Sequence, residues 1–359
     1  MVSGPPSARG RRPHEPEKNN AKNPTIHYNP PSEPPIWTAC APMMKVTIAP
    51  DSLKESLSAV EAARALARGL RAACEGVGIE AVPMADGGEG TVDAMVAATG
   101  GRIEELQAPD PLGRPVRARL GLWDGARRAV VEMAAASGLA LLAPQERDPL
   151  RTCTRGTGAL IRAALDAGAD RIIVGLGGSA TVDGGAGMAA ELGARFLDEG
   201  DHLIERPRGA DLERIRRVDL SGLDTRLAGA RIVAACDVIN PLLGQDGAAC
   251  VYAPQKGADS ESVQRLERGM RNYSDVLARD TGRDVASLPG AGAAGGLGAG
   301  LAALLGAELR SGVDTVMEAT GLRERMHGSA FALTAEGRVD GQSAFGKVPA
   351  GVARLGGEL

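Results

Sequence analysis

The chain has 359 residues, enough for two α/β lobes, because a single hydrophobic core rarely grows beyond about 250–300 residues. Its net charge of -4, with lysines and arginines spread along the chain, argues against nucleic acid or an anionic membrane as a partner, and no apolar run reaches the roughly 18 residues that span a bilayer. With 49 glycines and only 2% aromatic residues, the core must consist of Ala, Leu and Val with close backbone approaches, which suits helices packed on mainly parallel sheets.

The first segment, residues 1–43, is rich in proline and holds little that would form a core. Ten of the 22 prolines fall within residues 1–42, so we expect this extension to be disordered. It lacks the apolar region of a secretory signal, and the five cysteines show no CxxC pair and no His partner at metal-ligand spacing. We therefore expect reduced thiols and a cytoplasmic protein whose globular part begins at Met44, a candidate for the original start.

Two strand-loop-helix units open the globular part, and each places acids directly after a strand. The first predicted strand covers residues 45–49 and leads to a helix with a capping box at residues 58–61, and the second covers residues 79–83. In open α/β sheets, ligands bind at the carboxyl ends of the strands. The loops at these ends hold the candidate side chains Asp51, Ser52, Lys54, Asp86 and Glu89.

Antiparallel strands are expected next. Residues 109–115 read as a turn, residues 116–123 alternate as in an edge or antiparallel strand, and residues 129–133 are expected to pair with them. Residues 154–158 then open a helix that runs to about residue 167. This helix carries Arg155, a candidate anion-binding side chain.

The central feature is the glycine-rich stretch at residues 174–187, which follows the apolar run at residues 171–174 and precedes a predicted helix. It holds six glycines together with Ser179, Thr181 and Asp183. Glycine allows positive φ and lets several N–H groups point at one spot, where a helix N-terminus adds partial positive charge. We expect this loop to hold a phosphate and Asp183 to place a metal ion beside it.

The last part of the chain repeats the pattern of an acid after a strand. Residues 232–235 form a predicted strand followed by Asp237 and Asn240, and residues 330–334 form another, followed by Glu336 and Asp340. A helix is expected over residues 260–281, a glycine run over residues 289–300, and a further helix from about residue 347.

Seven acids occupy the same topological position, so in parallel sheets they are expected to converge on one crevice. Each alone is more often a helix cap. Together with glycine loops they suit Mg²⁺ held against phosphates, because Mg²⁺ prefers oxygen ligands. The seven acids are Asp51, Asp86, Glu89, Asp183, Asp237, Glu336 and Asp340. The cations that we expect to neutralise a phosphate or a substrate carboxylate are Lys54, Arg155, Lys256 and Lys347.

Two stretches also match dinucleotide fingerprints, which keeps an NAD-dependent dehydrogenase of a small hydroxy acid open as an alternative. Residues 175–180 fit GxGxxA after a strand, but no clear acid ends the next strand to hold a ribose. Residues 290–295 fit GxGxxG without a convincing strand before them, which favours close helix packing. The Walker pattern GxxxxGK[ST] is absent from the sequence. A small-ligand binding protein without activity is the non-enzyme alternative.

Six motifs in order resemble the glycerate kinase family that makes 2-phosphoglycerate. They are Ala49-Pro50-Asp51-Ser52-Leu53-Lys54, Ala85-Asp86-Gly87-Gly88-Glu89-Gly90-Thr91, Gly177-Gly178-Ser179-Ala180-Thr181, Cys236-Asp237-Val238 with Asn240-Pro241, Pro254-Gln255-Lys256-Gly257, and Glu336-Gly337-Arg338 with Asp340 and Gln342. The resemblance runs from Met44 to Leu359 and implies transfer of a phosphoryl group from ATP to the 2-hydroxyl of D-glycerate, with Mg²⁺, in a cleft between two lobes.

The resemblance fixes positions, and the roles are hypotheses from chemistry. For catalysis they are Asp51, Lys54, Asp86 and Asp183; for substrate binding, Ser52, Glu89, Arg155, Lys256 and Asp340; for ATP, Gly177, Gly178, Ser179, Thr181, Asn240 and Glu336; for the metal ion, Asp183 and Asp237. The oligomeric state is left open, a homo-oligomer included.

The sequence departs from the family pattern at two positions and at its end. Val182 stands where Asn is usual, and Ala335 stands where Gly is usual, a costly change if that position needs positive φ. Family members continue past the helix near residue 347, so we expect a first lobe that is truncated at its C-terminus. The predicted lobes are residues 44–92 with 287–359, and residues 93–286.

Overall fold

A computed structural model describes residues 44–53, 56–338 and 347–359. The extension at residues 1–43, expected to be disordered, lies outside these ranges, as do the predicted site residues Lys54 and Asp340. Among the described residues, no helix is both long and apolar enough to cross a membrane.

The smaller sheet has three strands in the order β11-β1-β2, and both pairs are parallel. Its strands are β1 (Lys45–Ile48), β2 (Gly78–Ala81) and β11 (Phe331–Leu333). Helix α1 (Ala59–Ala73) follows β1, and the predicted capping box is present, with Ser58 accepting from the Glu61 backbone N–H. Because the strands are parallel, the loops after all three lie at one edge of this sheet.

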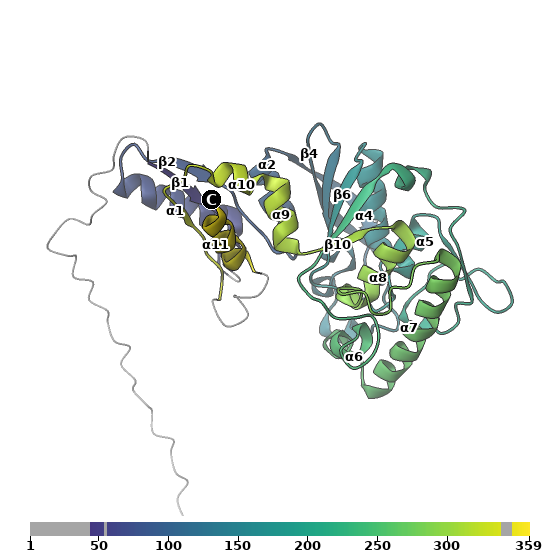
Figure 1. Ribbon diagram of the computed structural model, residues 1–359. Helices are drawn as coiled ribbons and strands as arrows, with labels where there is room; N and C mark the ends of the chain where they lie inside the picture. Colours follow the sequence, from purple (N-terminus) through teal and green to yellow (C-terminus); the bar gives the residue numbers. More distant parts are fainter. Residues whose placement is uncertain (1–43, 54–55, 339–346) are drawn as a thin grey trace, which may run out of the picture. The chain divides into compact units, whose positions relative to one another are not determined.

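The larger sheet has six strands in the order β10-β9-β6-β5-β4-β3 (Figure 1). Strands β5, β6, β9 and β10 run parallel, whereas β3 and β4 form an antiparallel extension paired to β5. Their bounds are β3 (Arg102–Pro109), β4 (Pro115–Trp123), β5 (Arg128–Glu132), β6 (Arg171–Gly175), β9 (Arg231–Ala235) and β10 (Glu308–Arg310). The mainly parallel α/β prediction is confirmed.

Helices flank the sheets. They are α2 (Thr91–Thr99), α3 (Ala134–Ser137), α4 (Arg155–Asp166), α5 (Ala186–Glu191), α6 (Ala248–Tyr252), α7 (Ser260–Thr281), α8 (Ala293–Leu305), α9 (Gly312–Thr320), α10 (Leu322–Met326) and α11 (Val348–Glu358). Short 3₁₀ helices are η2 (Leu139–Leu141), η3 (Pro144–Glu146), η4 (Gly209–Asp211), η5 (Thr225–Gly229) and η6 (Pro254–Lys256). The core between them is built largely from Ala, Leu and Val, as the composition indicated.

Strand β10 decides where the chain leaves the larger sheet. Residues Glu308–Arg310 pair in parallel with β9, so the chain stays with the larger sheet beyond residue 287, where the sequence placed the boundary. Helix α9 follows β10 directly and packs against α2, α10 and α11. We propose that the boundary between the lobes falls just after residue 310.

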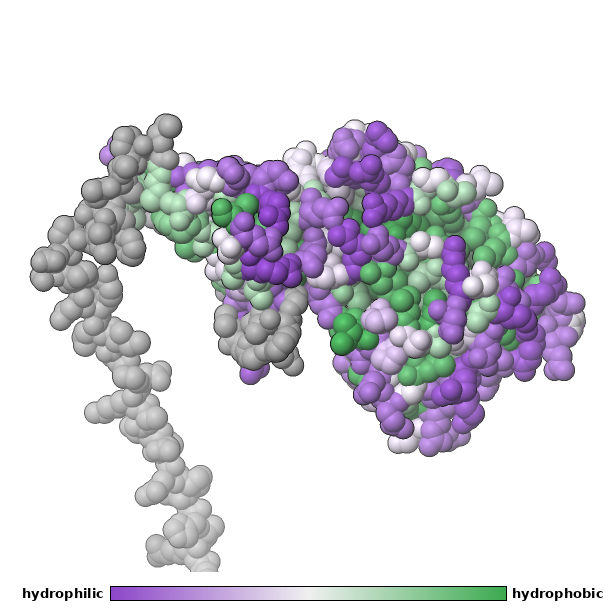
Figure 2. Space-filling model, viewed as in Figure 1, coloured by the Kyte–Doolittle hydropathy of each residue, from purple (hydrophilic) through white to green (hydrophobic). Residues whose placement is uncertain are grey.

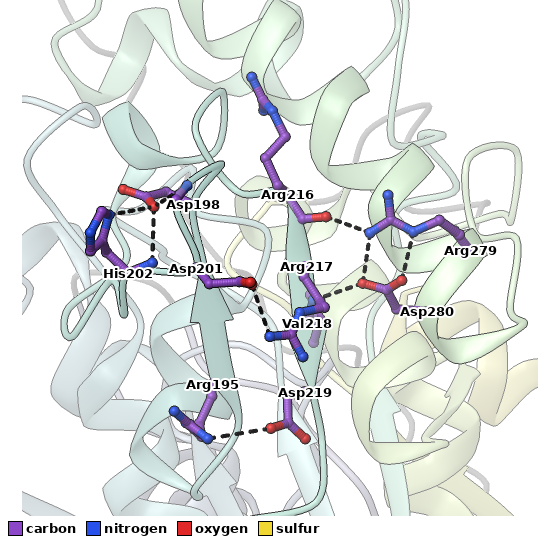
Figure 3. A network of polar contacts seen from close by, with 11 residues as sticks. Arg195, Asp198, Asp201, His202, Arg216, Arg217, Val218, Asp219, Arg279 and Asp280 are labelled. Carbon is purple, nitrogen blue, oxygen red and sulfur yellow. Dashed lines mark hydrogen bonds and ion pairs between the residues drawn. The ribbon is translucent and has the colours of Figure 1, made fainter.

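A two-stranded antiparallel ribbon, β7 (Arg195–Leu197) with β8 (Arg217–Asp219), is attached to the end of α7. The carboxylate of Asp280 accepts a hydrogen bond from the Val218 backbone N–H at 2.7 Å and is also paired with Arg279 (Figure 3). The surrounding arginine–aspartate pairs are largely exposed, and exposed pairs contribute little to stability. We infer that this network of polar contacts serves to attach the β7–β8 ribbon to the end of α7.

Two further observations concern the surface and the cysteines. On the face seen in Figure 2, apolar residues gather over the part of the chain that carries α8, and Ile239 is the most exposed large apolar side chain of the described residues, at 81%.

Cys153, Cys236 and Cys250 are free thiols. Cys74, which caps the end of α1, is disulfide-bonded, so the expectation that all five are reduced is wrong for Cys74.

Candidate active site

The loop after β6 lies against the loop after β2, and glycines on both sides make this approach feasible. A Cβ at Gly175 would overlap the carbonyl oxygen of Gly87, and one at Gly177 would lie 2.7 Å from the Cα of Gly88. Any side chain at either position would push the two loops apart. The glycines therefore bring the loop that carries Asp86 to the carboxyl end of β6.

Three consecutive backbone N–H groups in this loop, those of Gly177, Gly178 and Ser179, donate to no protein acceptor among the described residues. The loop is held from one side, because Gly178 O accepts from the Leu139 N–H at 2.8 Å and the Ala180 N–H donates to Ser137 O at 2.9 Å. Gly178 has φ +70°. Successive free N–H groups around a left-handed residue form a concave anion site.

Asp86 and Asp237 come together at the ends of β2 and β9. The Asp237 carboxylate accepts from the Gly312 N–H at 2.9 Å and from the Ser311 hydroxyl at 3.1 Å, so it also caps α9. Partial desolvation, and the nearby Asp86 carboxylate, raise the pKa of Asp237 to about 6, against the hydrogen bond from Gly312. A second acid that opposes ionisation of the first indicates a place where positive charge is favourable.

No cluster of three or more His, Cys, Asp or Glu suited to a metal ion occurs among the residues that the structure describes. This does not conflict with Mg²⁺, which keeps several waters and is usually held by one or two carboxylates plus substrate phosphates. The Asp86–Asp237 pair, beside the free N–H groups of the β6 loop, has the chemistry that such an ion requires.

Asp183 occupies a different environment, with none of its surface exposed. Its Oδ2 accepts from the Thr154 N–H at 2.7 Å, the Thr154 hydroxyl at 2.8 Å and the Gly187 N–H at 3.1 Å, while Oδ1 accepts from Gly185 at 3.3 Å. Burial raises the pKa of Asp183, and these hydrogen bonds oppose that rise. The carboxylate ties the N-termini of α4 and α5 together.

Three other predicted site residues are engaged by the protein itself. Arg155 is paired with Glu191 at 2.7 Å. The Asn240 side chain donates to Asp246 O at 2.8 Å and accepts from the Tyr252 hydroxyl at 2.7 Å. Lys256 is 1% exposed, and its Nζ donates to Ser179 Oγ at 2.6 Å and to Thr181 O at 2.7 Å.

A small pocket brings together three residues that the sequence singled out, Asp51, Ser52 and Glu89. Ser58, Gly90 and Asp93 line it as well, so it lies between the N-termini of α1 and α2. Asp51 is 8% exposed, and its Oδ1 accepts from the Ser52 N–H at 2.6 Å. The helix N-termini favour an anionic ligand, whereas the carboxylates of Asp51, Glu89 and Asp93 in the lining favour a ligand that also carries hydrogen-bond donors.

Glu336 lies next to this region, because the Asp51 N–H donates to Ala335 O at 2.8 Å. Its side chain is 5% exposed and forms an ion pair with Lys347. Among the described residues its Oε2 has no hydrogen-bond partner. Ala335 does not have positive φ. The backbone strain that an alanine would cause at a position with positive φ is therefore absent here.

Glu132, the last residue of β5, is a polar residue that the sequence analysis passed over. It is 9% exposed and accepts from the Val92 N–H at 2.7 Å at the start of α2. Burial raises its pKa, opposed by hydrogen bonds from Val92 and Gly90. The same signal used for the other acids, a carboxylate ending a strand, would have found it.

The glycine run at residues 290–300 is a packing surface. A Cβ at Gly295 would overlap Thr181 O, one at Gly300 would overlap Gly184 O, and one at Gly298 would overlap Gly290 O. Gly295 O also accepts from the Gly184 N–H at 3.1 Å. These contacts support the interpretation that the glycines at residues 290–300 serve close packing. The GxGxxG match is explained without a bound dinucleotide.

The loops of the two sheets meet at the carboxyl ends of parallel strands, and one loop carries a row of free N–H groups. This arrangement is typical of α/β proteins that bind phosphate-bearing ligands. The family model for the glycerate kinase family matches residues 46–358. The chain belongs to the glycerate kinase family, and the prediction from its motifs is confirmed.

Individual relatives and a solved structure support this family assignment. A glycerate kinase from Bacillus subtilis (strain 168) is 49% identical over 311 residues, 87% of this chain and 81% of the relative. A glycerate 2-kinase from Escherichia coli (strain K12) is 49% identical over 312 residues, 87% and 82% respectively. A crystal structure from Salmonella typhimurium LT2, of a protein provisionally named glycerate kinase 2, superposes with a TM-score of 0.84 at 50% identity, covering 88% of this chain and 84% of that one.

Proposed function

We propose that this protein is a glycerate 2-kinase that transfers the γ-phosphoryl group of ATP to the 2-hydroxyl of D-glycerate, giving 2-phospho-D-glycerate and ADP in the cytoplasm. Family membership and the relative named glycerate 2-kinase support the reaction. The observation that carries the proposal is the row of three free N–H groups at Gly177–Ser179, beside the Asp86–Asp237 pair. Phosphoryl transfer needs such a cradle, because the protein mainly positions the groups and neutralises charge.

On the phosphate side, the N–H groups of Gly177, Gly178 and Ser179 would hold phosphate oxygens of ATP. Asp86 and Asp237 would hold Mg²⁺ next to this loop. When bound, Mg²⁺ supplies charge neutralisation for the phosphates. Asp183 is buried and saturated with hydrogen bonds, so we assign it to holding the loop rather than to the metal ion.

On the acceptor side, the pocket between α1 and α2 would take D-glycerate. Its helix N-termini favour the carboxylate of the substrate. Asp51 and Glu89 would accept hydrogen bonds from the substrate hydroxyls, and Ser52 would donate one. Lys54 and Asp340 remain proposed site residues outside the described ranges. Arg155 and Asn240 we assign to supporting contacts, because their side chains are already paired.

A coupled assay tests the reaction. The protein is incubated with ATP, Mg²⁺ and D-glycerate, ADP is measured, and the product is passed to enolase without any phosphoglycerate mutase. An enolase signal that requires D-glycerate supports the 2-kinase. ADP without an enolase signal would indicate the 3-phosphate, and reduction of NAD by glycerate would indicate the dehydrogenase. No ADP at all would contradict the proposal and favour a binding protein.

A further inference from the structure

Lys256 is a buried cation whose contacts lead to the phosphate loop. It ends η6, and burial lowers its pKa to about 7, with the Asp183 carboxylate opposing that change. Burying a charged amine in the interior carries a desolvation cost. A methionine of similar length would fill the same space without that cost, so packing alone does not account for an amine at this position.

The direction of the hydrogen bond from Lys256 determines what Ser179 does. Lys256 Nζ donates to Ser179 Oγ at 2.6 Å, and in the protonated form of Lys256 the amine has no lone pair, so Ser179 Oγ can only accept this bond. The Ser179 hydroxyl proton then needs a different acceptor. Among the described residues no such acceptor is present. Ser179 is 9% exposed and belongs to the row of free N–H groups, so its hydroxyl is a further donor at the same place.

We propose that Lys256 is a positioning residue that fixes the Ser179 hydroxyl as a hydrogen-bond donor to a phosphate oxygen of ATP. The second bond from Lys256, to Thr181 O at 2.7 Å, holds the loop two residues further on. Lys256 thus acts through the loop and does not touch the substrate. This inference rests on the proposed kinase function and replaces the substrate-binding role that the sequence suggested for Lys256.

Four proteins test the coupling: the wild type, Lys256→Met, Ser179→Ala and the double variant. We expect each single variant to lower kcat/KM for ATP by about 10- to 100-fold, the range for a lost hydrogen bond to a charged group. KM for D-glycerate should stay within about twofold. The double variant should be no worse than the single ones, because both remove the same donor. Multiplicative losses, or a change confined to the glycerate KM, would overturn the proposal.

A stability measurement separates positioning from folding. Thermal unfolding of Ser179→Ala should show a cooperatively folded protein with a modestly lower Tm, because the buried Lys256 amine keeps Thr181 O and loses only the Ser179 acceptor. Ser179→Thr keeps a hydroxyl and should retain most of the activity. If Lys256→Met does not fold, the Ser179→Ala and Ser179→Thr pair still decides the point, because equal activity in the two would overturn it. Lys45→Met, at a half-buried lysine of β1 that donates to His327 O at 3.0 Å, is the matched control and should be unchanged.

The inference is also tested independently of glycerate turnover. ATP binding to the same four proteins, measured by equilibrium dialysis with Mg²⁺ and no glycerate, should show the same non-additive weakening. This separates the two failures. Loss of glycerate phosphorylation in the wild type contradicts the proposed function, whereas undiminished ATP binding in Ser179→Ala contradicts the role of Lys256.

Discussion

Asp183 and Thr154 are joined by two hydrogen bonds to one carboxylate oxygen, from the Thr154 backbone N–H at 2.7 Å and from its hydroxyl at 2.8 Å. The Thr154 hydroxyl in turn accepts from the Met188 N–H at 2.9 Å. Thr154 precedes α4, and Asp183 ends the loop after β6. This chain of bonds therefore ties the phosphate loop to the N-termini of α4, which precedes the loop, and of α5, which follows it.

Replacing Asp183 by Asn should reduce stability as well as activity. The amide would turn an NH₂ group toward N–H donors or leave them without an acceptor, at a cost of about 1–3 kcal/mol. Denaturant unfolding measures this cost, and Asp284→Asn, at an exposed turn acid that accepts from the Ala286 N–H at 3.0 Å, serves as control. A variant with full stability and no turnover would indicate instead that Asp183 takes part in the reaction.

The sequence predicted the strands that carry acids, because an apolar run followed by glycine and a carboxylate is a strong local pattern. It predicted α7 over residues 260–281 with its bounds, because the helix has a clear apolar face. It missed β10, a three-residue strand whose pairing with β9 is set by tertiary contacts. Short strands carry too little periodicity to be found alone.

Burial was the part of the site that local patterns did not reveal. In sequence, Asp183, Lys256 and Asp237 are each a charged residue in a segment with turn-forming glycine or proline, and no local pattern separates buried from exposed members. Asp183 and Lys256 are almost entirely buried, whereas Asp237 is exposed. The difference depends on how α5, α7 and α8 cover the loop, which is non-local information. The sequence therefore predicted the loops that form the proposed site, but it did not separate residues proposed to bind from residues that hold the loop.

Gly177→Ala should separate the β2 and β6 loops. The new Cβ would lie 2.7 Å from Gly88 Cα, and backbone cannot yield as a flexible side chain does. We expect kcat/KM for ATP to fall at least about tenfold, since small displacements of positioned groups cost this much or more. Gly229→Ala is the control, because a Cβ there meets nothing within 4 Å. Equal kinetics in the two variants would show that the loop contact is dispensable.

Asp237→Asn should raise the Mg²⁺ concentration needed for half-maximal rate by about 10- to 100-fold, because one of the two proposed carboxylate ligands becomes neutral. The measurement is initial rate against free Mg²⁺ at saturating ATP. The amide oxygen still caps α9 through the Gly312 N–H, so unfolding should change little. An unaltered Mg²⁺ requirement, with Asp284→Asn as the matched control, would remove Asp237 from the metal site.

Glu132 should make stability depend on pH. Burial raises the pKa of Glu132 in the folded protein above its value in the unfolded chain. Between those two values the folded state binds more protons, so the free energy of unfolding falls as pH rises and reaches its lower level above the folded pKa. Glu132→Gln does not titrate, and its amide oxygen can still accept from the Val92 N–H. The stability of Glu132→Gln relative to the wild type should therefore increase from pH 4.5 to pH 8.

Denaturant unfolding of both proteins across this pH range measures the effect. Gln107→Ala on β3, where the replaced side chain is exposed and does not titrate, should differ from the wild type by an amount that is independent of pH. A Glu132→Gln difference that stays constant or shrinks as pH rises would mean that the folded protein does not raise the pKa of Glu132. The start of α2 would then be held by an ionised carboxylate at every pH tested, and the hydrogen bonds from Val92 and Gly90 would outweigh its burial.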